Sequence, residues 1–317
     1  MNDTLALADI LSARDRIRDV AVRTPVVESP ALSRRFGREV YLKLECFQPT
    51  KVFKIRGAYN KISQVTSKNV VAASSGNHGM AVAYSSRLLG KKCTVVVPET
   101  AVQEKVNTIE EFGAEVVKFG RYSSERESKA REITEASGAV FIPPFNDRDV
   151  MAGQGTCGLE IAEQLKEFDS IIVPVGGGGL ISGISVAAKS LNPACRIFSV
   201  EPEGADKLSL SLKAGRIVRL ESPHSIADGL IPNSVGEMGF EICRRNVDGS
   251  FVVSDEEVVS AMGLMAKEAH VFAEPSGAAP VAALVAGRDV DRLGRRVVCV
   301  ISGGNVSLDL LRRILGS

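Results

Sequence analysis

The sequence predicts an α/β protein built from two open parallel sheets. From residue 70 onward, apolar runs of strand length alternate with stretches of helical spacing, which is the pattern of strand-helix-strand units. Three apolar runs end in turns that carry glycine, and 317 residues are enough for two domains. The predicted strands and helices each agree with this fold class.

The first predicted sheet follows an N-terminal helical segment. Residues 5–20 have helical apolar spacing, Thr24-Pro25 ends the segment, and residues 41–45 alternate like a strand. A small parallel sheet should come next. Its expected strands are Val70–Ala73, Thr94–Val97, Glu115–Phe119 and Val140–Ile142, and its helices end near Leu89, Phe112 and Ser137.

The second predicted sheet begins after Pro143-Pro144, where the alternation resumes. The apolar run at residues 297–301 is strand-like as well. The sequence indicates no internal repeat. The expected elements of this part are a helix at Gly153–Phe168, a strand at Ile171–Val175, a helix at Leu180–Leu191 and a strand at Ile197–Glu201.

Composition excludes several classes of function. The chain has 39 lysines and arginines against 38 acids, so the charge balance does not indicate a nucleic-acid partner. The six cysteines form no CxxC pair and are expected to be reduced core thiols. The first residues lack a signal pattern, and no apolar run approaches the ~20 residues of a membrane helix. We therefore expect a cytoplasmic protein without a membrane partner.

Lys54 is the first candidate for chemistry. It lies between Phe53 and Ile55, at the expected start of a helix. Burial lowers the pKa of a lysine and makes its free amine available as a nucleophile near neutral pH. The alternative is a surface lysine whose stem covers apolar neighbours while its charge stays in water.

Glycine-rich turns form the second group of candidates. Ser74–Gly79 and Gly176–Gly179 each follow an apolar run and precede a helix, and Ser302–Asn305 follows the run at 297–301. A helix start with glycines before it exposes backbone N–H groups that bind phosphate. The alternative is a plain strand-to-helix turn, but such a turn needs fewer than four consecutive glycines.

In this order of motifs the chain resembles the fold-type II pyridoxal-phosphate enzymes, in the branch of threonine/serine dehydratases and serine racemases. The motifs are the lysine segment, SSGNHG, the glycine tetrad, EPSG at 274–277 and SGGN at 302–305. The resemblance implies a large domain of residues 1–67 and 147–317 and a small mobile domain of 68–146. The cofactor, pyridoxal 5′-phosphate, would lie in the cleft between them, and no C-terminal regulatory domain is expected.

The resemblance also implies the residues that hold the cofactor. Lys54 would form the Schiff base with its aldehyde and then remove the substrate's α-proton. A hydroxyl opposite the pyridine nitrogen holds the ring protonated less well than a carboxylate, which suits loss of a β-leaving group. The other implied contacts are Phe53 packing on the ring, Gly176, Gly177, Gly178 and Gly179 on the phosphate, Asn77 on the 3′-oxygen, Ser302 at the ring nitrogen and Glu274 in the pocket wall.

Substrate contacts are implied around the SSGNHG turn. The N–H groups from Ser74 to His78 would bind the α-carboxylate, with His78 acting through its backbone. Ser75 matches a position that exchanges a proton on the face opposite the lysine, and it is equally a good helix cap. Arg126 would reach a second carboxylate or else be a solvated helix residue. Asp228 would line the pocket or else serve a local turn.

One departure from the resemblance concerns metals. Relatives activated by magnesium or calcium provide oxygen ligands at the positions of Glu201, Ala205 and Lys207, with an acid at the last. An ammonium cannot coordinate a metal, but it can pair with Glu201. We therefore expect no divalent metal, although a shifted Asp206 would provide an alternative ligand. Val52 replaces a common serine, which leaves room for a different substrate preference.

The expected function is an ammonia-lyase that removes water from L-threonine or L-serine. The motif order supports this branch, while a racemase or a 3-hydroxyaspartate dehydratase shares every motif. A non-catalytic cofactor-binding regulatory protein is the alternative from another class, since a fold does not fix its function. The substrate is a small amino acid, and a homodimer or a dimer of dimers is the default assembly.

Overall fold

The computed structural model describes residues 5–74, 76–101, 103–121 and 123–316. Its larger sheet has six strands in the order β1-β2-β10-β7-β8-β9, and only the edge strand β1 is antiparallel to its neighbour. Strand β2 lies beside β10, so the two ends of the chain share one sheet. The strands are β1 (Val26–Glu28), β2 (Glu39–Leu44), β7 (Ser170–Pro174), β8 (Arg196–Pro202), β9 (Gly249–Val253) and β10 (Arg296–Ile301).

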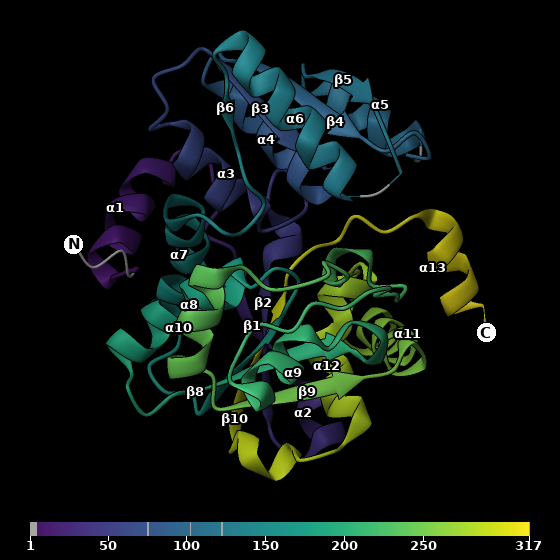
Figure 1. The fold of residues 1–317 in the computed structure, drawn as a ribbon. Coiled ribbons are helices and arrows are strands. Elements are labelled where there is room, and N and C mark those ends of the chain that lie inside the picture. Colours follow the sequence, from purple (N-terminus) through teal and green to yellow (C-terminus); the bar gives the residue numbers. More distant parts are fainter. Residues whose placement is uncertain (1–4, 75, 102, 122, 317) are drawn as a thin grey trace.

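The smaller sheet has four parallel strands in the order β5-β4-β3-β6. Its central strands consist largely of buried valine and alanine, which suits a sheet covered on both faces. Figure 1 shows it in the upper part of the molecule, with the larger sheet below. The strands are β3 (Asn69–Ala73), β4 (Lys92–Val97), β5 (Glu115–Lys118) and β6 (Val140–Phe141).

Helices cover both sheets, and α3 lies between the two parts of the molecule in Figure 1. Three helices begin directly at predicted site residues, because α3 starts at Lys54, α4 at Asn77 and α8 at Gly179. The helices are α1 (Leu7–Ile17), α2 (Pro30–Phe36), α3 (Lys54–Ile62), α4 (Asn77–Leu88), α5 (Gln103–Glu111), α6 (Ser123–Ser137), α7 (Arg148–Gln164), α8 (Gly179–Leu191), α9 (Lys207–Ala214), α10 (Glu237–Asn246), α11 (Asp255–Leu264), α12 (Pro275–Ala286) and α13 (Leu308–Leu315).

The predicted alternation of strands and helices is confirmed, with one helix displaced. The helix expected at Gly153–Phe168 is α7, which runs from Arg148 to Gln164. It begins earlier because the Asp147 side chain accepts hydrogen bonds from the backbone N–H groups of Asp149 and Val150 and so caps the helix.

The cysteines agree with the expectation of core thiols. All six are buried and free of disulfides, and burial raises their pKa values, for example that of Cys46 to about 12. Among the helices of the described ranges, none is long and apolar enough to cross a membrane.

Candidate active site

Lys54 occupies the first position of α3, and its side chain is partly buried. Its Nζ atom donates a hydrogen bond to the carbonyl oxygen of Pro144 at 2.8 Å and lies 5.3 Å from the centroid of the Phe53 ring. No carboxylate among the described residues lies within 4.0 Å of it. Burial lowers the pKa of Lys54 to about 8. A substantial share of this amine is therefore neutral and nucleophilic near physiological pH.

The third glycine turn lies directly beside Lys54. Val52 forms an antiparallel bridge with Gly303, and the Phe53 N–H donates to the carbonyl oxygen of Ser302 at 3.0 Å. Ser302 is buried at the end of β10. These backbone contacts fix the predicted partner of the ring nitrogen next to the helix that carries the amine.

Asn77 and Glu274 meet although they are 197 residues apart in the chain. Asn77 Nδ2 donates to Glu274 Oε1 at 2.7 Å, and Asn77 Oδ1 accepts from Asn305 at 2.8 Å. Burial, together with the negative charge of Asp228, raises the pKa of Glu274 to about 8, so its carboxyl group is protonated at neutral pH. A Cβ atom on Gly303 would lie 2.3 Å from Glu274 Oε1, so only glycine fits there.

The sequence predictions did not include Asn305 as a site residue. It joins two of the predicted motifs, because its Nδ2 also donates to the Thr50 carbonyl oxygen at 3.2 Å. Its place as the last residue of SGGN was the available signal. Its partners come from distant segments, and local sequence does not reveal such contacts.

The glycine tetrad forms the turn from β7 into α8. Gly178 has φ of 94°, a conformation that favours glycine, and it caps α8. A Cβ on Gly177 would lie 2.1 Å from the Phe145 ring, and one on Gly176 would lie 2.6 Å from the Gly229 carbonyl oxygen. Packing therefore accounts for part of the glycine content that the sequence alone attributed to a ligand. The N–H groups at the start of α8 remain the anion-binding feature of the turn.

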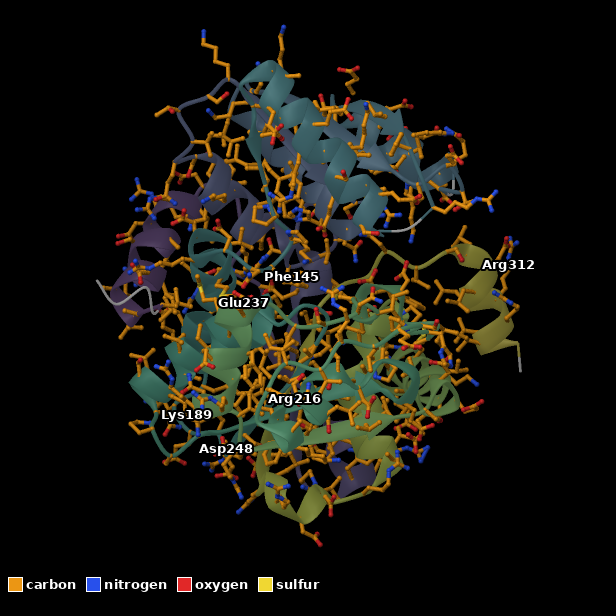
Figure 2. The ribbon with its side chains drawn as sticks, in the orientation of Figure 1. Phe145, Lys189, Arg216, Glu237, Asp248 and Arg312 are labelled. Carbon is orange, nitrogen blue, oxygen red and sulfur yellow. The ribbon has the colours of Figure 1, made fainter. Side chains whose placement is uncertain are left out.

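Phe145 was not predicted as a site residue, yet its ring lies against the glycine turn. It belongs to the segment between β6 and α7, near the middle of the molecule in Figure 2. The neighbouring Pro144 accepts the hydrogen bond from Lys54. One short segment thus contacts both the amine and the turn.

The His78 side chain is buried and its Nε2 donates to the Ile142 carbonyl oxygen at 2.9 Å. Burial lowers the pKa of His78 to about 3, so the ring is neutral. This geometry agrees with the expectation that His78 contributes its backbone and position rather than an acid or base.

Three predicted residues have other local surroundings. The Ser74 hydroxyl accepts from the Gly76 N–H, and Arg126 Nη1 donates to the Arg121 carbonyl oxygen near the start of α6. Asp228 is exposed and pairs with Lys105 at 2.7 Å, which joins η3 (Asp228–Leu230) to α5. Ser75 lies outside the described residues.

Lys207 pairs with Glu201 at 3.1 Å, as the sequence indicated, and both side chains are fully buried. Groups of three or more metal-binding side chains were not found within the described ranges.

This arrangement fits a cofactor with an aldehyde and a phosphate. Lys54 provides an amine that is partly neutral near pH 8. The start of α8 provides N–H groups for a dianion, and the glycines there have no side chains to obstruct it. The partly buried Asn77 and the buried Glu274 provide further polar groups.

Comparisons with known proteins also indicate an enzyme that uses this kind of cofactor. Residues 17–303 match the family model described as pyridoxal-phosphate dependent enzyme. The chain is 42% identical over 315 residues to an L-threonine ammonia-lyase of Thermotoga maritima. The aligned region covers 98% of this chain and 78% of that protein. It is 40% identical to an L-threo-3-hydroxyaspartate ammonia-lyase of Saccharomyces cerevisiae, over 95% of this chain and 93% of that protein.

The structure of maize serine racemase superposes with a TM-score of 0.94 at 38% identity, covering 98% of this chain and 96% of that one. The maize structure therefore shares the fold of this chain, and the three relatives are named for different reactions. Because the family match spans residues 17–303, and with them both sheets, Lys54 and the first two glycine turns, the chain belongs to the pyridoxal-phosphate dependent enzymes, and its cofactor is pyridoxal 5′-phosphate.

Proposed function

We propose that this enzyme is a threonine/serine dehydratase that removes water from L-threonine or L-serine. The enamine product hydrolyses to 2-oxobutyrate or pyruvate and ammonia. The threonine ammonia-lyase of T. maritima, 42% identical over 98% of this chain, supports this substrate class. The position of the Lys54 amine at the start of α3, beside the Phe53 ring and the Ser302 turn, is the observation that carries the chemistry.

Residues of both domains would bind the cofactor, and Lys54 would also transfer the proton. When bound, pyridoxal phosphate supplies an electron sink for the α-carbon of an amino acid. Lys54 would hold the cofactor's aldehyde carbon and take the proton from the substrate's α-carbon. Phe53 would pack on the ring, Ser302 would face its nitrogen, and the turn Gly176–Gly179 would bind the phosphate.

The substrate would be held by the start of α4. The N–H groups from Ser74 to His78 would bind the α-carboxylate, and Asn77 would hold the cofactor's 3′-oxygen. The bond from Asn77 to Glu274 fixes the amide of Asn77, and Glu274 would line the pocket wall. We keep Ser75 as the proton donor or acceptor on the face opposite Lys54.

Two further substrate contacts complete the proposal. Arg126 would reach a second carboxylate, and Asp228 would line the pocket mouth. The pair of Asp228 with Lys105 joins the part of the molecule that contains α5 to the part that contains η3, which supports a position of Asp228 at the edge of the proposed pocket.

A racemase or a 3-hydroxyaspartate ammonia-lyase is the second candidate. The yeast relative and the maize structure support it, since their identities of 40% and 38% are close to that of the threonine enzyme.

We propose that the enzyme needs no divalent metal, because the Lys207 ammonium pairs with Glu201 and donates to the Ala205 carbonyl oxygen. We also propose the domain boundaries 1–67 with 147–317 and 68–146, a homodimer or dimer of dimers, and a cytoplasmic location.

One experiment tests the function. The cofactor-loaded protein is incubated with L-threonine, L-serine, D-serine or 3-hydroxyaspartate, with and without EDTA, and both 2-oxo acid and enantiomer content are followed. Lys54→Ala is the matched control. Oxo acid from L-threonine that survives EDTA is expected. Enantiomer conversion without oxo acid, or activity confined to 3-hydroxyaspartate, would assign the second candidate.

A further inference from the structure

A second buried lysine lies next to the phosphate-binding turn without belonging to the residues assigned to the reaction. Lys207 is the first residue of α9, and its side chain is fully buried. A cation at the start of a helix is unfavourable, because the helix dipole presents positive charge there. Burying the ammonium adds a further cost. Favourable hydrogen-bond partners must offset both the cost of the helix dipole and the cost of burial.

Four oxygen atoms surround the Lys207 ammonium. They belong to the Val175, Ala205 and Leu230 carbonyls, at 3.0, 3.0 and 2.9 Å, and to Glu201 Oε1 at 3.1 Å. The two oxygens of Glu201 also accept hydrogen bonds from the N–H groups at Leu208 and Ser209. We call the four oxygens around the Lys207 ammonium, from Val175, Ala205, Leu230 and Glu201, the oxygen cage.

The oxygen cage joins the chain segments that shape the glycine turn. Val175 directly precedes Gly176, and Leu230 directly follows Gly229. The Gly229 carbonyl oxygen lies 2.6 Å from where a Cβ on Gly176 would be, so these two segments are in direct contact. The ammonium bonds to one carbonyl on each side of that contact.

We propose that Lys207 is a positioning residue, a built-in cation that holds the turn Gly176–Gly179 in its phosphate-binding shape. The inference rests on the proposed phosphate-binding role of that turn. It predicts that the affinity for pyridoxal phosphate depends on a positive charge inside the oxygen cage. It also predicts that a free cation replaces the side chain when Lys207 is shortened, since carbonyl and carboxylate oxygens are the ligands of hard cations.

The test measures cofactor binding without substrate, so it stays independent of which amino acid the enzyme uses. Wild type, Lys207→Ala and Lys207→Met are dialysed against pyridoxal phosphate with tetramethylammonium, ammonium or potassium chloride at equal ionic strength. The dissociation constant and the visible absorbance of the bound cofactor are measured. Lys213→Ala, an exposed lysine of the same helix, is the control for loss of charge.

For wild type and Lys213→Ala we expect one affinity in all three salts. Lys207→Ala should bind the cofactor at least tenfold more weakly in tetramethylammonium, which is too large for the cage, and recover in ammonium or potassium. Lys207→Met should stay weak in every salt, because its side chain fills the space. Unchanged affinity of Lys207→Ala in tetramethylammonium would overturn the proposal, as would a loss that neither small cation reverses.

Lys207→Gln covers the case in which the alanine variant does not fold. It keeps most of the volume and a donor but lacks the charge, so we expect weak cofactor binding without a response to ammonium. Wild-type affinity of this variant would refute the need for a cation. Failure to act on L-threonine would count against the proposed function and leave these binding results unaffected.

Discussion

Lys54 and Lys207 have opposite surroundings. Burial lowers the pKa of both Lys54 and Lys207. Lys54 has a single carbonyl partner, whereas Lys207 has four oxygens, one of them from the carboxylate of Glu201, whose charge opposes the shift. The first amine is thus free to lose its proton and react, whereas the four oxygens around the second favour its ammonium form. The hydrogen-bond partners of each lysine therefore determine whether it can react as a nucleophile or serves to hold the fold.

Removing the reactive amine should have the largest effect. Lys54→Ala leaves no nucleophile for the cofactor's aldehyde, so we expect the visible absorbance of the bound cofactor to vanish and activity to fall by about a thousandfold or more. Absorbance spectra and oxo acid formation measure this. An unchanged spectrum would refute the role of Lys54, and Lys213→Ala should match wild type.

The helix that carries Lys54 rests on a buried ion cluster. Arg56 bonds to Glu45 and Glu160 at 2.7 Å each, and Lys43 also pairs with Glu160. Arg56→Met leaves two acids with one cation, so the free energy of unfolding should fall by about 3–5 kcal/mol.

Urea unfolding measures this loss. The control is Arg312→Met, because Arg312 pairs with Asp309 on the surface of α13 (Figure 2) and should change stability by less than ~1 kcal/mol. Equal losses for the two variants would contradict the structural role of the cluster.

Cofactor capture should follow the pKa of Lys54. Its neutral form is the nucleophile, so the rate at which cofactor-free protein binds pyridoxal phosphate should rise with pH and level off above about 8. Between pH 6 and pH 8 the neutral fraction of such a group increases about fiftyfold. Butylamine in place of the protein is the control, and its rate should continue to rise well beyond pH 8. A parallel rise in both would show that Lys54 has an ordinary pKa.

The segment before Lys54 contains backbone strain. Lys51 has φ of 59°, a region that disfavours side chains, and its carbonyl oxygen accepts from the Gly304 N–H. Lys51→Gly should raise the melting temperature, corresponding to about 1 kcal/mol. Lys51→Ala keeps the strain and should give no such gain. A gain for alanine equal to that for glycine would point to charge rather than backbone conformation.

The sequence predicted the alternation of strands and helices because each element repeats its apolar period locally. It also placed Lys54 and the glycine tetrad at helix starts, since both follow recognisable runs. The start of α7 was wrong by five residues, although the capping Asp147 was visible in the sequence.

Contacts between distant segments could not be predicted from the sequence. The hydrogen bond from Lys54 to Pro144, the packing of Phe145 on Gly177 and the bridging by Asn305 join positions that no local pattern connects. The pair of Lys207 with Glu201 was expected, because the resemblance places both residues where metal-activated relatives have oxygen ligands. The carbonyl oxygens of Val175 and Leu230 come from elsewhere in the fold and complete the cage.

The central claim is that Lys54, rather than another buried lysine, holds the cofactor. Reduction of the cofactor-loaded protein with borohydride fixes the pyridoxyl group to the amine that carries it, and peptide mass spectrometry then locates it. The account predicts one pyridoxyl group, on the peptide that contains Lys54. Labelling of Lys207 or Lys43, or an unlabelled Lys54 in protein that retains the cofactor, would contradict it.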